Sequence, residues 1–335
     1  SAWIAGPVHQ AWWLMDNLSG MGGPNPAEWY TRQAALGRKI VARMVELGIE
    51  PAIPGFIGMV PESIAGSNPY GGTWTSGINC PVVINATQTA VFDGIAKNYY
   101  KRLKEIFGYS PKYYANDVMH ERGNATGSEA NYKAVCDNTR KAMEDYATYD
   151  GGEKPTWIAQ MWQSNAEQFR INSLSDDHTL LLDLSSERTT YKGRYGSKEY
   201  LFCMLHNYGG NIGMYGCMQK MLDEYRSHKQ TGIANGSNGT LKGVGATPEG
   251  IETNPVLYDM LFELPWYGSD INAETWLNDY ATSRYGVANS NAGRAWNRLR
   301  TTVYSNTSSS QQGCREPVFC ARPNLSGNNA SAWAG

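Results

Sequence analysis

The chain has few charged residues for its length and no surplus of either sign. Asp, Glu, Lys and Arg make up 18% of its 335 residues, whereas an average soluble protein has about 25%. The 29 basic and 31 acidic residues leave a formal net charge of -2, so the positive surplus of a general nucleic-acid binder is missing. No apolar run reaches the ~18 residues that a membrane-spanning helix needs. The composition therefore predicts no nucleic-acid partner and no membrane span.

Cysteine and histidine are sparse, and their spacing excludes the common zinc motifs. The six cysteines form no Cys-x-x-Cys pair, and the five histidines do not gather near them, so no metal site is predicted. Cys203 and Cys217 lie in apolar stretches and are predicted to be buried thiols. Cys314 and Cys320 lie in a polar tail, and the sequence is compatible with a disulfide between them. Walker and Rossmann glycine motifs are also missing from the contexts that they require.

Aromatic residues with a polar group are plentiful. The chain has 21 Tyr and 11 Trp but only 7 Phe, a choice that suits a wet, concave binding site. Its 41% hydrophobic content is enough to fill a core and argues against disorder. At roughly 150 residues per domain, the length allows two or three domains, or one large barrel with an appendage.

Helical and strand-like stretches alternate along most of the chain. The first helix is predicted from an N-cap at Asn25, with Pro26 in the first turn, to a stop at Gly48, with Leu36 and Ile40 on its apolar stripe. Strand candidates separated mostly by helices predict a parallel sheet. The candidates are 49–57, 112–119, 156–162, 179–185, 199–205 and 241–246, although the Gly/Asn-rich segment 233–245 reads as a surface loop. After residue 264 only helices are expected, at 273–285 and 289–303.

Two glutamates directly follow predicted strands. Glu121 follows the run 113–119, and Glu187 follows the run 180–186. For each glutamate alone, the pattern favours an exposed loop residue, but active groups of parallel α/β barrels gather where the strands end, and both glutamates satisfy that rule. Glycoside hydrolysis needs a pair of carboxylates, one protonated to donate to the leaving oxygen and one to attack the anomeric carbon or activate water.

Further candidates for sugar binding lie in loops and at strand ends. Tryptophan rings stack on the apolar faces of pyranose rings, and Trp12, Trp74 and Trp162 are placed to do so, with core packing as the alternative. His206 and Asn207 close another predicted strand just before two glycines. The polar side chains and the two glycines would let the backbone approach a ligand closely. The alternative is a tight turn in which His206 is hydrogen-bonded within the protein.

Several long stretches resemble the α-N-acetylglucosaminidases, glycoside hydrolase family 89. The resemblance lies in Ala-Trp-Trp-Leu-Met-Asp-Asn-Leu within 6–24, in 48–61, in Leu-Leu-Leu-Asp-Leu-Ser-Ser-Glu at 180–187, and in Phe-Cys-Met-Leu-His-Asn-Tyr-Gly-Gly-Asn at 202–211. It continues at 247–254 and runs in order through nearly the whole chain. The resemblance implies a TIM-type (β/α)8 barrel, here about strands 3 to 8 over residues 1–265, and the start of an all-α domain at 266–335. The first two strands are then expected to precede Ser1, and the segment alone to be a poor catalyst.

The resemblance also implies a chemistry and a set of site residues. A retaining hydrolase of terminal α-linked N-acetylglucosamine on heparan-type or mucin-type glycans is expected, with no cofactor. Glu121 would be the acid/base and Glu187 the nucleophile, while His120 would orient the acid or the sugar. Trp12, Trp74 and Trp162 would face the sugar. In bacterial members of the family a glycine usually follows the acid, whereas Arg122 follows Glu121 here. Arg122 would lower the pKa of Glu121 if it faced inward.

Other functions and properties stay open at this point. A non-catalytic glycan-binding chain would keep the tryptophans and tolerate the loss of a carboxylate, and a retaining glycosidase of other sugar specificity would use the same barrel. A homo-oligomer is compatible with the sequence. The expected location is secreted, periplasmic or lysosomal, with the signal outside this chain, and eight Asn-x-Ser/Thr sequons are only a weak indication of secretion.

Overall fold

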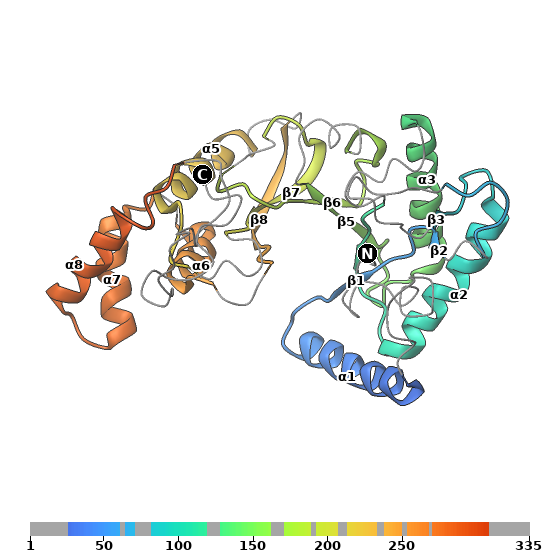
Figure 1. Cartoon of the computed structure of the whole chain (residues 1–335), viewed down its shortest axis with the longest axis horizontal. Coiled ribbons are helices and arrows are strands. Elements are labelled where there is room, and N and C mark those ends of the chain that lie inside the picture. The colour runs from blue at the N-terminus through green and yellow to red at the C-terminus, as the bar shows by residue number, and fades with distance from the viewer. Residues whose placement is uncertain are drawn as a thin grey trace, which may run out of the picture. The chain divides into compact units, whose positions relative to one another are not determined.

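The computed structural model describes ten stretches of the chain in two compact units (Figure 1). The stretches are 26–60, 64–70, 82–118, 128–161, 171–188, 192–206, 213–232, 238–249, 253–267 and 270–307. The first unit comprises Ser1–Ala159 and Gln163–Leu180, and the second comprises Gln160–Trp162 and Leu181–Gly335.

In the first unit, short parallel strands form the sheet. Strand β1 (Ala52–Pro54) pairs with β4 (Tyr113–Ala115), which pairs with β5 (Thr156–Met161), and the beginning of β6 follows β5. Ile53, Tyr114 and Trp157 lie in register across the three strands, and all three are buried. Residues in register point to the same face of a sheet, so this row forms part of the core. A separate antiparallel pair joins β2 (Met59–Val60) to β3 (Val82–Val83).

Three helices of the first unit pack side by side in sequence order. Helix α1 (Ala27–Glu46) contacts α2 (Thr89–Phe107), and α2 contacts α3 (Glu129–Tyr146), as Figure 1 shows. Helix α2 ends at Gly108, which has a left-handed φ of 69°, a conformation that glycine adopts without strain.

The prediction for the first helix is confirmed at its end and wrong at its start and in its apolar stripe. The helix ends at Glu46, and Gly48 follows its C-cap with a left-handed φ of 74°, as predicted. It begins at Ala27, so Pro26 rather than Asn25 is the N-cap. Leu36 and Ile40 of the predicted stripe are each 50% exposed, and the buried residue is Val41. The reason is a close approach to α2, because a Cβ on Gly37 would lie 2.9 Å from the Phe107 ring. Because α1 contacts α2 at Gly37, the side of α1 that carries Gly37 and Val41 faces α2 instead of the predicted stripe.

The second unit also contains parallel strands. The end of β5 is followed by β6 (Thr179–Asp183), β7 (Gly196–Met204) and β8 (Asn238–Ala246). Helix α5 (Met218–Gly232) lies between β7 and β8 in sequence and packs on β8, as does α6 (Pro255–Glu263). The predicted loop at 233–245 is therefore wrong from Asn238 onward. Its glycines permit close strand pairing, since a Cβ on Gly245 would lie 2.7 Å from Cys203 Sγ.

The helices after residue 264 share a core with the strands of the second unit. The short helix η4 (Leu264–Trp266) leads to α7 (Ala273–Tyr285) and α8 (Ser290–Arg300), which lie side by side (Figure 1). Trp276 and Leu277 of α7 belong to the same buried cluster as Phe202 of β7. The parallel α/β pattern followed by helices is therefore confirmed for the described residues up to 307, and α7 has the predicted bounds.

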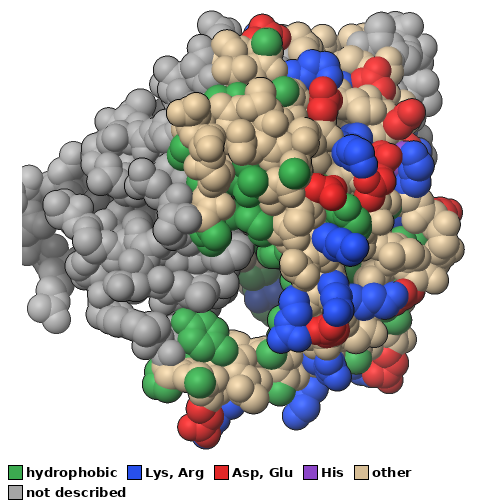
Figure 2. All heavy atoms as spheres, turned by 90° about the vertical axis from the view of Figure 1, so that its right-hand side faces the viewer, with side chains coloured by type: hydrophobic (Ala, Val, Ile, Leu, Met, Phe, Trp, Pro, Cys, Tyr) green, Lys and Arg blue, Asp and Glu red, His purple; other side chains and the backbone are tan. Residues whose placement is uncertain are grey.

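Charges on the helical face drawn in Figure 2 alternate in sign. Ion pairs on α2, α3 and the following loops join Lys133 to Asp137 at 2.8 Å and Lys112 to Glu153 at 2.7 Å. This mixed pattern agrees with the small net charge of the whole chain. Among the described helices, none is long and apolar enough to cross a membrane.

Candidate active site

The turn after β6 carries Glu187 and is fastened to neighbouring strands. Ser186 donates its backbone N–H to the carbonyl of Cys203 on β7 at 2.9 Å, and its hydroxyl donates to the carbonyl of Asp183 at 3.0 Å. Thr247, just after β8, donates its hydroxyl to the carbonyl of Leu184 at 2.8 Å. The turn at residues 184–188 is thus held from the ends of β7 and β8, which is where a parallel barrel builds its active groups.

The Glu187 carboxylate is buried and surrounded by N–H donors. Its Oε1 accepts from Arg188 Nε at 2.9 Å and from the backbone N–H of His206 at 3.0 Å, while Oε2 accepts from the backbone N–H of Leu205 at 3.4 Å. Glu187 and Arg188 form an ion pair whose side chains are 1% and 0% exposed. The donors stabilise the negative charge, and because two of them come from the end of β7, they also fix its position.

His206 lies directly beside this carboxylate. Its backbone has a left-handed φ of 68°, which is uncommon outside glycine and marks a sharply turned strand end. Burial, and after it the positive charge of Arg188, lowers the pKa of the His206 ring to about 4. The ring is therefore neutral at physiological pH. Its Nε2 lies 2.9 Å from Asn254 Nδ2, and Asn254 Oδ1 accepts from the Tyr304 hydroxyl at 3.0 Å.

Two tyrosine rings complete the surroundings of His206. The ring of Tyr258 on α6 packs edge-on at a centroid distance of 5.8 Å, and that of Tyr215 lies at 6.2 Å. The guanidinium of Arg188 lies 6.0 Å from the centre of the Tyr215 ring. Burial raises the pKa of the Tyr258 hydroxyl, and the charge of Glu187 raises it further. Tyr258 is thus neutral and is held close enough to Glu187 to sense its charge.

The structure describes Glu187 and His206 of the predicted site and brings them together. The remaining predicted residues lie outside the described part of the chain, namely Trp12, Trp74, His120, Glu121, Trp162 and Asn207. Arg188, Asn254 and Tyr304 contribute to this site but were not predicted from the sequence. Asn254 lies in a segment that carries the family resemblance, and Arg188 follows Glu187 directly, so two of the three could have been considered. Tyr304 has no sequence signal, because only the fold brings it to Asn254.

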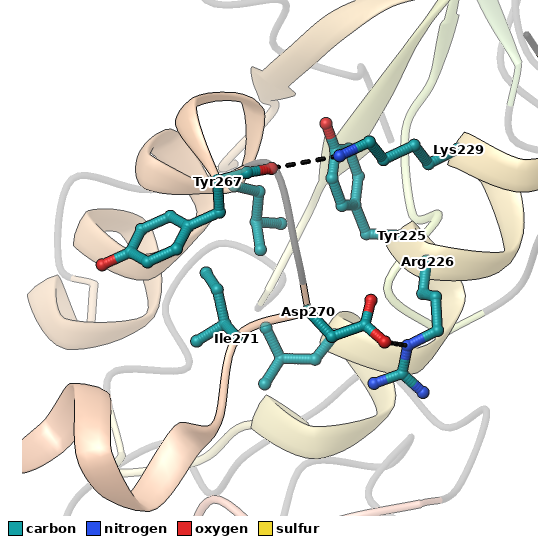
Figure 3. A pocket seen from close by; sticks show the side chains of 8 residues that line it. Tyr225, Arg226, Lys229, Tyr267, Asp270 and Ile271 are labelled. Carbon is teal, nitrogen blue, oxygen red and sulfur yellow. Dashed lines mark hydrogen bonds and ion pairs between the residues drawn. The ribbon is translucent and has the colours of Figure 1, made fainter.

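One surface pocket of the second unit lies elsewhere. It is lined by α5, η4 and the segment before α7, and neither Glu187 nor His206 lines it (Figure 3). In Figure 3 Arg226 Nε pairs with Asp270 Oδ2 at 2.6 Å, and Lys229 Nζ donates to the carbonyl of Tyr267 at 3.0 Å. These contacts fasten the segment before α7 to α5, so the pocket belongs to helix packing. Within the described residues, His, Cys, Asp and Glu form no group that could hold a metal ion.

Comparisons with known proteins match the chain to one family over nearly its whole length. The family model described as "Alpha-N-acetylglucosaminidase (NAGLU) tim-barrel domain" matches residues 1–268, and the model for the C-terminal domain of that family matches residues 276–334. The human protein named Alpha-N-acetylglucosaminidase is 28% identical over 351 residues, which is 98% of this chain and 46% of the human protein. The chain thus spans about half the length of that curated relative.

Solved structures give the same result. A family 89 glycoside hydrolase from Clostridium perfringens in complex with PUGNAc has a TM-score of 0.79 and 31% identity, over 98% of this chain and 37% of that one. Its complex with 2-acetamido-1,2-dideoxynojirmycin has the same TM-score and coverage at 30% identity. A variant of the same enzyme with two glutamates replaced by glutamine, in complex with its substrate GlcNAc-alpha-1,4-galactose, has a TM-score of 0.78, 30% identity and the same coverage. The parallel sheet with its following helices is therefore part of a TIM barrel and its C-terminal domain, and the chain belongs to the α-N-acetylglucosaminidase family, glycoside hydrolase family 89.

Proposed function

We propose that this chain carries catalytic residues of a retaining glycoside hydrolase that removes terminal α-linked N-acetylglucosamine from heparan-type or mucin-type glycans. The observation that carries the proposal is the Glu187 carboxylate, held at a strand end by Arg188 and by the backbone N–H groups of the two residues that follow β7. The family match and the acetamido sugars bound by the bacterial relative support the choice of sugar.

The stereochemistry of the sugar supports a protein nucleophile. In an α-glycoside of N-acetylglucosamine, the acetamido group and the leaving group lie on the same side of the ring. The acetamido oxygen is therefore unable to attack from the side opposite the leaving group, as it does in enzymes with substrate-assisted catalysis. Glu187 would supply the attacking oxygen in its place. The bacterial relative with two glutamates replaced, caught with its substrate, supports a chemistry that needs two carboxylates.

The reaction proceeds in two displacements. First, a Glu187 oxygen forms a bond to the anomeric carbon as the glycosidic C–O bond breaks, and Glu121 gives its proton to the leaving oxygen. Second, Glu121 takes a proton from water, the water oxygen bonds to the anomeric carbon, and Glu187 leaves as a carboxylate. Arg188 and the N–H groups of Leu205 and His206 receive the restored negative charge in the second step.

The remaining predicted residues are proposed to bind the sugar. His206 and Asn207 would hydrogen-bond its oxygens, His120 would orient the acid or the sugar, and Trp12, Trp74 and Trp162 would wall the subsite. Residues 1–265 would form the barrel and 266–335 the beginning of the helical domain. A secreted, periplasmic or lysosomal location and a homo-oligomer stay predictions.

The test replaces one buried carboxylate at a time in the longest reading frame that contains residues 1–335. Glu187→Gln removes the proposed nucleophile, and Asp183→Asn is its control, because Asp183 is also buried and lies just before the same turn. Both variants are assayed on an aryl α-N-acetylglucosaminide, and thermal unfolding confirms that each folds. We expect Glu187→Gln to lose at least ~10³-fold in kcat, as removal of a reacting group does, and Asp183→Asn to stay within about tenfold. Equal activities of the two folded variants would overturn the role of Glu187.

A further inference from the structure

A buried hydrogen-bonded chain runs from the C-terminal helices to the proposed nucleophile. The Tyr304 hydroxyl donates to Asn254 Oδ1 at 3.0 Å, and Asn254 Nδ2 lies 2.9 Å from His206 Nε2. The His206 backbone N–H then donates to Glu187 Oε1 at 3.0 Å. Tyr304 and His206 are each 3% exposed and Asn254 is 7% exposed, so water does not compete for these bonds.

The side chain of Asn254 makes unusual contacts for a residue at the start of a helix. It is the N-cap residue of α6, yet its side chain makes no capping hydrogen bond to that helix. Asparagine is among the most favourable N-cap residues because its side-chain oxygen accepts from the first free N–H groups of a helix. Here that oxygen accepts from Tyr304 instead, and the amide nitrogen faces His206. The capping role is thus given up for the contact with the histidine.

Tyr304 is itself held firmly in place. Its carbonyl accepts from the backbone N–H of Met218 at the start of α5 at 2.9 Å, and its N–H donates to the carbonyl of Leu299 at 3.0 Å. The hydroxyl is therefore presented to Asn254 by a backbone that is fixed on both sides. With the Tyr304 hydroxyl at Oδ1, the Asn254 amide presents its NH₂ group to His206.

The direction of this amide determines where the histidine proton lies. An amide NH₂ group only donates, so Nε2 of His206 must be the acceptor. A neutral imidazole carries one ring proton, which then lies on Nδ1. The pKa of His206, lowered to about 4 by burial and then by Arg188, keeps the ring neutral. Among the described residues, none is hydrogen-bonded to Nδ1.

We propose that Asn254, held by Tyr304, is a positioning residue that keeps His206 in the neutral Nδ1–H tautomer, so that the ring offers a donor to an acceptor oxygen of the sugar. The oxygen is a hydroxyl or the acetamido carbonyl. The part that concerns the sugar rests on the proposed function, whereas the tautomer does not. With the amide turned the other way, Nε2 would carry the proton and Nδ1 would be an acceptor, and the site would select the opposite hydrogen-bonding partner.

NMR identifies the tautomer of His206 directly, and the measurement does not require enzymatic activity. The protein is labelled with ¹⁵N in its five histidines, and long-range ¹H–¹⁵N spectra distinguish a protonated ring nitrogen from an unprotonated one. A His206→Gln variant identifies the His206 signals by their loss. We expect Nδ1 protonated and Nε2 unprotonated at pH 7. A protonated Nε2 in the unmodified protein would overturn the proposal.

Variants then test the residues that set the tautomer. Asn254→Asp replaces the donor with an acceptor of the same shape, so the ring proton should move to Nε2. Tyr304→Phe removes the donor that orients the amide, so both tautomers should appear. Tyr258→Phe is the matched control, because Tyr258 packs on His206 through its ring and should leave the tautomer unchanged. The same tautomer in all three folded variants would contradict a positioning role for Asn254.

A binding measurement separates this proposal from the proposed function. Binding of 2-acetamido-1,2-dideoxynojirmycin is followed by calorimetry in the unmodified protein and in Asn254→Asp, with an aryl α-N-acetylglucosaminide for kinetics. We expect Kd and KM to rise at least tenfold in Asn254→Asp, with a smaller change in kcat. The expected tautomer in a protein that binds no acetamido sugar would contradict the proposed function alone. Normal binding by Asn254→Asp with a displaced proton would contradict the donor role alone.

Discussion

The backbone N–H of His206 donates to Glu187 Oε1 at 3.0 Å, so the end of β7 holds the carboxylate that follows β6. The two residues are adjacent only because the strands are parallel neighbours in the sheet, where their carboxyl ends meet at one edge. Burial of both side chains makes their environment sensitive to the charges and hydrogen bonds around them.

The Glu187–Arg188 ion pair should be costly to break from either side. Arg188→Met would leave a buried carboxylate without its guanidinium, and we expect the free energy of unfolding to fall by about 3–5 kcal/mol. Lys133→Met, which breaks an exposed helix pair with Asp137, should cost less than about 0.5 kcal/mol. Urea unfolding of the two variants measures both values. The double variant Glu187→Gln with Arg188→Met should recover part of the stability lost in Arg188→Met. Equal losses of stability in Arg188→Met and Lys133→Met would contradict the description of the Glu187–Arg188 pair as buried.

Buried histidines should make the protein sensitive to acid. Burial lowers the pKa of both His206 and His228 to about 4, below the ordinary value of about 6.5. Between these values the unfolded chain binds protons that the folded protein does not, so stability falls as the pH drops from about 6.5 to about 4. We expect His228→Gln to flatten the dependence of unfolding free energy on pH in this window.

The control for this prediction is an exposed histidine. His178 is exposed and has a positive φ of 50°, a conformation that asparagine tolerates. His178→Asn should therefore leave the pH dependence unchanged. An equal flattening in both variants would argue that burial is not the cause.

The close pairing of β7 and β8 should reject a side chain at one glycine and accept it at another. A Cβ on Gly245 would lie 2.7 Å from Cys203 Sγ, whereas the nearest atom to a Cβ on Gly243 is Leu201 Cδ2 at 3.8 Å. We expect Gly245→Ala to destabilise the protein by about 1–3 kcal/mol, with recovery when Cys203→Ala is added. Gly243→Ala in the same strand should have a small effect, measured by thermal unfolding. The interpretation fails if Cys203→Ala gives no recovery.

The buried thiols should resist alkylation in the folded protein. Burial raises the pKa of Cys136, Cys203 and Cys217, so the reactive thiolate is scarce as well as inaccessible. We expect iodoacetamide to label these three cysteines only in urea, with mass spectrometry locating the sites. Labelling of Cys203 or Cys217 at native conditions would contradict their burial, which the apolar sequence around them also predicts.

Local signals predict most of the fold. Strand-like runs separated by helices predicted the parallel sheet, and Gly48 marked the end of α1 because its left-handed conformation favours glycine. The errors arose where tertiary contact overrides local pattern. Contact at Gly37 turned Val41 toward α2, and glycine-rich residues from Asn238 onward formed a strand because β7 accepts a partner with small side chains.

The candidate site was only partly predictable. Glu187 and His206 were found because each ends a strand-like run, which is a local property. Asn254 and Tyr304 act through contacts that are 48 and 50 residues apart in sequence, and no periodicity reports such contacts. The roles proposed for Glu121 and for Trp12, Trp74 and Trp162 rest on the family resemblance and stay predictions.

Covalent trapping tests the nucleophile most directly. A 5-fluoro α-N-acetylglucosaminyl fluoride reacts with a retaining enzyme to give a long-lived glycosyl-enzyme, because the fluorine slows the hydrolysis of the intermediate. The longest reading frame that contains residues 1–335 is treated with this reagent, digested and analysed by mass spectrometry. We predict one added sugar on the peptide that contains Glu187, and none in the Glu187→Gln variant. A sugar attached to a different carboxylate, or active enzyme that releases the inverted anomer without an adduct, would contradict the assignment of Glu187 as the nucleophile.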